Sequence, residues 1–372
     1  MPQIHLKHIP LPLIENDPLQ LPYWELTASA DGPTLLIVAA QHGNEVQGSE
    51  ALRRFILLAG EDLHAGKIFA VPFCNPLAVQ RRRHHDTQGP EEPVSEQPER
   101  NMNRQWPGDP AGNDIQRTVH AIYSALGARA THVVDIHCWN RFWAAAGLPR
   151  RDRPESLELA SISALPFARR SDPPSWTQPP SDVGRGFIPR RGWREGEVPP
   201  PRRGMNPRPT EGAAPPTTLG SLFDNTNRPS LTFELAGQFV VEENQVALGL
   251  RCLTNIARHL GMMPGEPEGT DEGPVWTDDH ESTELLAPGN GLFVGSGLEP
   301  GDWVEEGQLL GHLIGEDNLA TIPLCAPAGG RLAAYGAHRA FCDVALPAMH
   351  PYASVRELIA RIVIAPRGER PA

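Results

Sequence analysis

The sequence is poor in lysine, in paired cysteines and in long hydrophobic segments. Lys7 and Lys67 are the only lysines, and five cysteines are scattered along the chain without paired spacing. An odd number of unpaired cysteines argues against a disulfide framework and indicates reduced thiols. No apolar run approaches the ~20 residues of a membrane span, and no charged segment leading into an apolar core marks a secretory signal. We therefore expect a cytoplasmic protein without a membrane partner.

The sequence also has fewer basic than acidic residues. The 33 Lys and Arg residues face 45 Asp and Glu residues, which gives a formal net charge of −12. Such a chain is a poor general ligand for nucleic acid. Its 372 residues favour two domains.

Strand-like and helix-like segments alternate over the first two thirds of the chain. Nearly continuous apolar runs predict buried strands at 34–40, 68–73, 131–136 and 230–235. Apolar residues at helical spacing predict helices at 45–58, 114–126 and 243–260, the last stopped by Gly261. This alternation predicts an α/β fold with a mixed sheet flanked by helices.

The rest of the chain has a different composition. A Pro- and Arg-rich stretch at about 169–216 is expected to be an insertion, and 81–98 a long surface loop. A Gly- and Pro-rich linker at 264–274 precedes short strand-like pieces cut by glycine turns. We therefore expect an α/β domain over 1–263 and a small β-barrel or sandwich over 275–372.

Polar residues suited to chemistry follow the four predicted strands. They are His42 and Glu45, Asn75, Asp135 and His137, and Glu234. Because the carboxyl ends of strands form the ligand crevice of open α/β sheets, these side chains are expected to meet at one edge. The alternative for Glu234 is an ion pair with an arginine at the edge of the sheet.

Two histidines and one carboxylate, from His42, Glu45 and His137, form the open three-ligand set of a catalytic zinc. The alternative is that His42 and Glu45 only cap the following helix. Asp135 fits either a hydrogen-bond partner of a ligand histidine or a strand-end salt bridge, and the sequence leaves both open. Cys138 should point away from the metal, since neighbours on a strand face opposite sides.

Five motifs in order, together with an APAGG-containing C-terminal segment, carry a family resemblance. The motifs are QHGNE, NPLAV, RNMNRQWPG, DIH and FELAG. With them the chain resembles the succinylglutamate desuccinylase/aspartoacylase family of zinc-dependent deacylases, which are related to zinc carboxypeptidases. The resemblance implies a carboxypeptidase-type α/β core, one Zn²⁺ per chain, and hydrolysis of the amide bond of a small N-acyl amino acid.

The resemblance also implies roles for individual residues. His42, Glu45 and His137 match the metal ligands, and Glu234 matches the general base. Asn103 and Arg104 match a pair that grips a substrate carboxylate, for which the planar arginine fork is suited. Without the other motifs, Asn103 and Arg104 would be interpreted as a turn residue and a solvated charge.

The chain departs from the family pattern at three places. The family's carbonyl-polarising arginine is expected nine residues after Asn75, where this chain has His84. Either the neighbouring Arg83 serves, or His84 does, or the role is weakened. Asn101-Met102 replaces the usual Asp-Leu, and Cys138 replaces a small hydroxyl residue.

Other functions are considered beside the deacylase. A metallocarboxypeptidase would share the metal set and the base, and a metal-free pseudo-enzyme or binding protein would lack the chemistry. The C-terminal segment resembles lipoyl- or biotinyl-carrier barrels, but those need a lysine and none follows Lys67. The sequence leaves open the acyl group, the amine and whether the chain forms a homo-oligomer.

Overall fold

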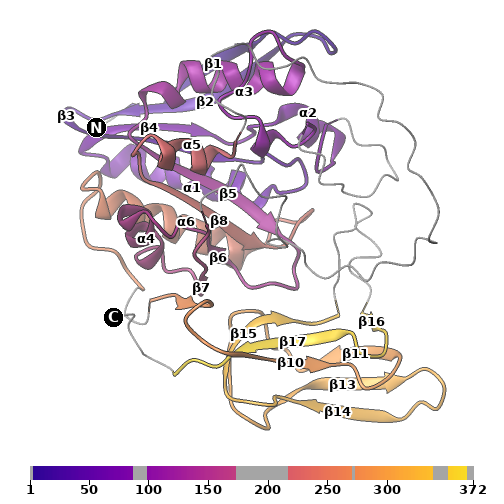
Figure 1. The fold of residues 1–372 in the computed structure, drawn as a ribbon. Coiled ribbons are helices and arrows are strands. Elements are labelled where there is room, and N and C mark those ends of the chain that lie inside the picture. The colour runs from indigo at the N-terminus through magenta and orange to yellow at the C-terminus, as the bar shows by residue number, and fades with distance from the viewer. Residues whose placement is uncertain (1–2, 87–98, 173–216, 270–272, 338–350, 367–372) are drawn as a thin grey trace.

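The structure is a computed structural model that describes residues 3–86, 99–172, 217–269, 273–337 and 351–366 (Figure 1). Within the expected insertion at 169–216, all but the first four residues lie outside these ranges, as do residues 87–98 of the expected surface loop. The end of the described part of that loop is not at the surface, because His84, His85 and Asp86 are buried, so the surface-loop expectation is wrong there. Nothing in the structure bears on the parts outside the described ranges.

A nine-stranded mixed sheet forms the centre of the larger part of the molecule (Figure 1). Its order is β1-β2-β4-β3-β5-β8-β6-β7-β9. The four central strands β4, β3, β5 and β8 run parallel, and β1 and β2 extend the sheet in antiparallel fashion. The bounds are β1 His5–Leu11, β2 Leu19–Thr27, β3 Ala30–Ala39, β4 Ala65–Val71, β5 His132–Trp139, β6 Ala146–Gly147, β7 Phe167–Ala168, β8 Ser230–Ala236 and β9 Val275–Trp276.

Helices cover both faces of this sheet. One buried cluster joins the sheet to α1, α4 and α6, and a second joins it to α3 and α5. The helices are α1 Gln47–Asp62, α2 Pro76–Arg81, α3 Asp114–Ala125, α4 Pro154–Ser161, α5 Leu219–Asn225 and α6 Glu243–His259, with short 3₁₀ turns at Met102–Arg104 and Gly127–Arg129. The resulting three layers confirm the α/β prediction with its mixed sheet.

All four predicted strands and all three predicted helices are present, with shifted bounds. The helix predicted from residue 45 begins at Gln47 and its N-cap, Val46, makes no side-chain cap hydrogen bond. Glu45 therefore lies before the helix, and the interpretation of Glu45 as a helix cap is wrong. Residues Asp135, His137 and Glu234 lie within their strands, β5 and β8, rather than after them.

The C-terminal part contains two four-stranded antiparallel sheets, β10-β17-β15-β12 and β14-β13-β11-β16. Leucine, isoleucine and aromatic side chains from both sheets fill the space between them, which confirms the predicted sandwich. Main-chain hydrogen bonds from Ala144 to Ala333 and from Tyr335 to Phe142 join it to the larger part. Its strands are β10 Ser282–Leu286, β11 Gly291–Gly295, β12 Trp303–Val304, β13 Leu309–Gly315, β14 Thr321–Cys325, β15 Gly330–Tyr335, β16 Tyr352–Ala353 and β17 Leu358–Val363.

Both lysines of the chain bind the same glutamate. Glu25 on β2 lies 3.0 Å from Lys7 Nζ on β1 and 3.6 Å from Lys67 Nζ on β4. Lys67 is near the start of β4, and its register partner on β3 is Thr34. This charged group therefore lies at the amino ends of the parallel strands.

Two expectations from composition can be compared with the described residues. Cys74, Cys138, Cys252 and Cys325 are free thiols, as predicted. No helix in the described part of the chain has the length and apolar character required to cross a bilayer.

Candidate metal centre and active site

A tight turn after β3 carries the first two candidate ligands. Gly43 in this turn lies against α2, and a Cβ atom there would be 2.1 Å from the Ala78 carbonyl carbon. Glycine is therefore required by close packing of two backbones. The turn places His42 and Glu45 side by side, because the Glu45 N–H donates to the His42 carbonyl at 3.1 Å.

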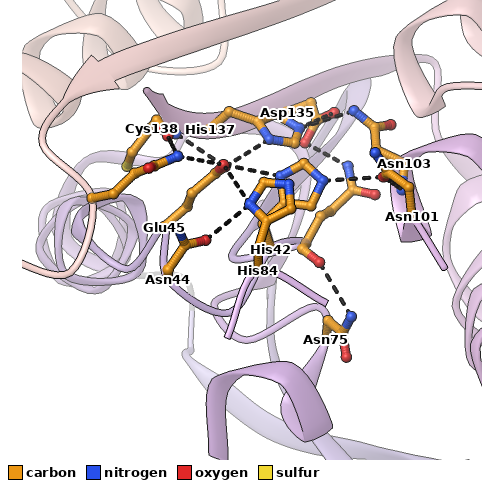
Figure 2. Close-up of polar contacts among 12 residues, drawn as sticks. His42, Asn44, Glu45, Asn75, His84, Asn101, Asn103, Asp135, His137 and Cys138 are labelled. Atoms are coloured by element: carbon orange, nitrogen blue, oxygen red, sulfur yellow. Dashed lines mark hydrogen bonds and ion pairs between the residues drawn. The ribbon is translucent and has the colours of Figure 1, made fainter. Parts of the chain in front are cut away.

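The third candidate ligand comes from the neighbouring strand β5. His137 Nδ1 lies 2.9 Å from Glu45 Oε2, and His42 Nδ1 lies 3.0 Å from Glu45 Oε1 (Figure 2). The potential ligand atoms of the three residues lie within 4.8 Å of one another, and all three side chains are buried. The structure thus brings together the three residues that the sequence singled out.

The donor set fits a zinc ion. Two imidazole nitrogens and one carboxylate leave a fourth tetrahedral position open, as in catalytic zinc sites. Zinc–nitrogen bonds of ~2.0–2.1 Å imply ligand separations of about 3.3 Å in a tetrahedron. The separations of 3.0 and 2.9 Å between Glu45 and the two Nδ1 atoms are close to that value.

Further polar groups hold these ligands from behind. Asp135 Oδ2 lies 3.1 Å from His137 Nε2, so Asp135 is the partner of a candidate ligand. Asn101 Oδ1 lies 3.1 Å from His42 Nε2, on the side of the ring away from Glu45. The main-chain N–H of Cys138 donates to Glu45 Oε2 at 3.1 Å. Each ligand therefore has a fixed orientation before any ion arrives.

Burial and neighbouring charges shift the pKa values of the cluster residues in opposite directions. Burial raises the pKa of Glu45, but His42 and His137 outweigh burial and hold that pKa well below its usual range. Burial lowers the pKa of His137, but Asp135 and Glu45 hold it well above the usual value. Burial, with the neighbouring His42, lowers the pKa of His84 well below its usual value. The Glu45 carboxylate is thus kept ionised, as a metal ligand must be.

Glu234 on β8 is the register partner of His137 on β5. Side chains alternate along a strand, and Phe233 and Leu235 belong to the core beneath α1 and α6, so Glu234 faces the same side of the sheet as His137. Part of its side chain remains exposed. Burial, followed by the Glu45 and Asp135 charges, raises the pKa of Glu234 to about 8 against the opposing effect of His137. A carboxyl group with this pKa can carry a proton at neutral pH.

The expected substrate-binding pair is divided between the interior and the surface. The Asn103 amide nitrogen lies 3.0 Å from His137 Nε2, and its oxygen accepts the Leu219 N–H at 3.0 Å. Arg104 is exposed, and its guanidinium donates to the Asn103 carbonyl at 2.7 Å.

Of the two residues weighed for the missing arginine, His84 lies against the metal cluster. Its ring stacks on that of His42 with centroids 3.8 Å apart, and its Nδ1 lies 3.1 Å from Asn44 Oδ1. Arg83 is half-buried and donates its main-chain N–H to Ala78. The structure therefore brings His84 to the cluster.

His42, His84 and His85 form a second group of potential ligands within 4.8 Å of one another. The sequence did not single out His85. A neutral imidazole has one lone pair, so His42 can serve one group at a time. Its Nδ1 faces Glu45, which favours the group containing His137.

Sequence reasoning missed several polar partners of the cluster. Gln41 donates to Asp135, and Gln238 donates to Glu45 Oε1 at 3.3 Å and to the Cys138 carbonyl at 2.8 Å. The signal for Gln41 was its place beside His42 in QHGNE. The Cys138 side chain lies in the apolar core, as predicted.

A mixed α/β sheet with a buried His-Glu-His group at the ends of its parallel strands defines a candidate metallohydrolase. Comparison with known proteins identifies the family. The model of the succinylglutamate desuccinylase/aspartoacylase catalytic domain matches residues 31–260. The chain belongs to the succinylglutamate desuccinylase/aspartoacylase family, a family of deacylases.

A curated relative carries a more specific name. N-alpha-acetyl-L-2,4-diaminobutyric acid deacetylase of Halomonas elongata is 30% identical over 113 residues. The match spans 30% of this chain and 30% of the relative.

Solved structures resemble the whole chain in fold. A succinylglutamate desuccinylase/aspartoacylase from Rhodobacter sphaeroides is 18% identical with a TM-score of 0.60, covering 98% of this chain and 96% of that one. The product-bound ectoine utilization protein EutE (DoeB) from Ruegeria pomeroyi is 17% identical with a TM-score of 0.60, covering 97% and 95%. At these identities the likeness establishes the fold.

Proposed function

We propose that this protein is a zinc-dependent deacylase that hydrolyses the amide bond of a small N-acyl amino acid in the cytoplasm. The observation that carries the proposal is the convergence of His42, Glu45 and His137 at buried, hydrogen-bonded positions. Family membership supports the deacylase chemistry. One Zn²⁺ per chain would be held by these three residues and would supply Lewis-acid activation of water and of the acyl carbonyl.

Glu234 is the proposed general base. It faces the same side of the sheet as His137, and a carboxylate there can take a proton and, once protonated, return it. Glu234 takes a proton from the attacking water and later delivers it to the departing amine. This assignment gives the leaving nitrogen the proton that it needs to depart as a neutral amine.

The remaining roles fall to residues around the cluster. Arg104 holds the carboxylate of the amino-acid part, which fixes the amide over the cluster, and Asn103 takes part in substrate binding by accepting the Arg104 guanidinium at its carbonyl. Arg83 stabilises the negative charge that develops on the carbonyl oxygen. His84 contributes to substrate binding without this charge role, since a neutral ring donating its Nδ1–H to Asn44 has no second N–H.

The substrate class is tested with a panel of N-acyl amino acids. N-acetyl-diaminobutyrate belongs in the panel because a relative is named for it, and N-acetylaspartate and N-succinylglutamate belong there because the family is named for their deacylation. Zinc is removed with a chelator and restored, and free amine is measured. We expect turnover of at least one N-acyl amino acid that requires restored zinc.

Metal content provides the second half of the test. We expect one zinc per chain in the wild type and less than a tenth of that in His137→Ala. A folded wild-type protein that takes up no zinc would refute the proposal. Release of amino acids from peptides, with no deacylation of the panel, would support the metallocarboxypeptidase alternative instead.

A further inference from the structure

Four buried side chains form a continuous chain of polar contacts behind the candidate metal ligand. Trp106 Nε1 donates to Gln41 Oε1 at 2.8 Å, and Gln41 Nε2 donates to Asp135 Oδ1 at 2.7 Å. Asp135 Oδ2 lies 3.1 Å from His137 Nε2. Trp106, Gln41 and Asp135 are 0% exposed, so no solvent can replace these partners. The chain runs from the loop before α3 to the ligand on β5.

The direction of every hydrogen bond in this chain follows from one group. An indole nitrogen can only donate, so the Gln41 oxygen must face Trp106 and the Gln41 NH₂ must face Asp135. An amide turned the other way would set two donors against each other at Trp106 and two acceptors against each other at Asp135. Asp135 Oδ1 is therefore an acceptor, and Oδ2 is the oxygen that faces His137 Nε2.

We propose that Gln41, oriented by Trp106, is a positioning residue that fixes the proton of His137 on Nε2 and so leaves the lone pair of Nδ1 for the metal. This inference rests on the proposed function, because it concerns how the ligand is prepared. A neutral imidazole carries its proton on one nitrogen, and that position is set by the hydrogen bond at the other side of the ring.

Asn103 also contacts His137 Nε2, and a hydrogen bond donated by its amide would favour the other tautomer of the ring. The Asn103 amide nitrogen is 3.0 Å from His137 Nε2 and is itself held by the Leu219 N–H at its oxygen. A hydrogen bond donated by Asn103 would require a lone pair on Nε2 and move the proton to Nδ1, facing Glu45. The Glu45 carboxylate at Nδ1 is also a charged acceptor, but a metal ion bound at Nδ1 would take that lone pair and leave the proton at Nε2. There the charged Asp135 carboxylate makes a hydrogen bond roughly twice as strong as a neutral partner would. Gln41 keeps Asp135 in that role.

The test compares zinc affinity in Gln41→Met, Trp106→Phe and the double variant. Partners of ligands are worth ~10- to 100-fold in metal affinity, so we expect Gln41→Met to raise the zinc dissociation constant about tenfold. Trp106→Phe should raise it about threefold. Because Trp106 acts only through Gln41, the double variant should be no weaker than Gln41→Met. Dissociation constants are measured by competition with a zinc chelator.

A matched control separates positioning from loss of a buried hydrogen bond. Ser49 on α1 is also buried and donates to the Pro72 carbonyl, so Ser49→Ala should leave zinc affinity unchanged. Equal affinities for Gln41→Met and Ser49→Ala would overturn the inference, and so would effects of Gln41→Met and Trp106→Phe that simply add.

¹⁵N-histidine spectra give a readout other than zinc affinity. With zinc bound, we expect the wild type to carry the His137 proton on Nε2 and none on Nδ1, with the signal assigned from His137→Ala. In Gln41→Met this proton should exchange faster with solvent. An unprotonated Nε2 would overturn the inference even if zinc binds. If the wild type takes up no zinc, the proposed function fails, while the exchange rate of the Nε2 proton in wild type and Gln41→Met still tests whether Gln41 holds Asp135 against His137; equal rates would overturn the inference.

Discussion

The two parts of the molecule bury very different side chains. Among the described residues, the buried side chains of polar and charged residue types all fall between Glu25 and Asn255, and the C-terminal sheets enclose an apolar core. Burying a polar group costs free energy unless it is hydrogen-bonded, and burying a charge costs more. The larger part offsets this cost at the carboxyl ends of its parallel strands. There His42, Glu45, Asp135 and His137 make polar contacts with one another. From this contrast we expect the chemistry in the larger part and a supporting role for the C-terminal sheets.

The largest expected effect is at Glu234. Glu234→Gln keeps the shape but removes the proton carrier, so we expect turnover to fall about a thousandfold, within the ~10²–10⁴ range of general acid–base catalysis. Zinc content should not change. Glu243→Gln, at an exposed acid paired with Arg54, is the control and should keep wild-type turnover. Turnover of Glu234→Gln within tenfold of the wild type would exclude Glu234 as the base.

The supporting part is tested through its core. Leu332 on β15 is fully buried between the two C-terminal sheets, so Leu332→Ala should lower the free energy of unfolding by about 2–5 kcal/mol. The zinc affinity of the folded protein should stay the same. Leu319→Ala, at a side chain that is 78% exposed, should change neither quantity. Urea unfolding and zinc titration of all three proteins check this, and a parallel loss of zinc affinity would contradict the division of labour.

Asp224 tests the cost of a buried carboxyl group away from the metal cluster. It accepts the Ser156 hydroxyl at 2.9 Å, and burial raises its pKa from 3.8 to about 6. Because the folded state binds this proton more tightly than the unfolded chain, ionised Asp224 lowers stability above pH 6, by up to about 3 kcal/mol. This cost disappears as the pH falls from 6 toward 4.

Asp224→Asn should therefore be more stable than the wild type at pH 8 and equal to it near pH 4.5. Unfolding free energies measured across this range give the difference curve. A constant difference between the two proteins at all pH values would show that Asp224 is not the titrating group.

Arg83 and His84 can be distinguished by paired substitution. If Arg83 stabilises the charge on the carbonyl oxygen, Arg83→Ala should lower kcat about a hundredfold. His84→Ala should mainly raise KM, and Arg82→Ala, at an exposed neighbour, should change neither parameter. A larger fall in kcat for His84→Ala than for Arg83→Ala would transfer the role to His84.

The smallest effect is expected at a partly exposed ion pair. Lys67 lies 3.6 Å from Glu25 with 32% of its side chain exposed, and such pairs contribute ~0.2–1 kcal/mol. Lys67→Ala should therefore lower the free energy of unfolding by less than 1 kcal/mol and leave activity unchanged. A loss comparable with that of Leu332→Ala would mean that surface charge matters as much as core packing.

The central strands and the ligand trio were predictable because their signals are local. Continuous apolar runs mark strands buried on both faces. His137 directly follows such a run, and His42 and Glu45 lie in the short turn that follows another. The strands β1 and β2 were missed because they contain Pro10 and Pro22, which weaken a strand pattern. Strands of two residues, such as β6 and β7, carry no periodic signal at all.

The polar partners of the ligands were harder to predict because they depend on contacts between distant segments. Gln41 and Asp135 are 94 residues apart in sequence and meet only because β3 and β5 are neighbours in the sheet. Asn101 was visible only as a departure from a motif, and its contact with His42 spans 59 residues. Such pairs are defined by topology and register, which one sequence does not specify.

The shared position of the two lysines allows the protein to be immobilised in a defined orientation. Amine-directed reagents at Lys7 or Lys67 would attach beside Glu25, at the amino ends of the parallel strands. The His-Glu-His group lies at the opposite, carboxyl ends of these strands. Protein coupled to a bead or sensor chip through these side chains would present its reactive edge to the surrounding solution.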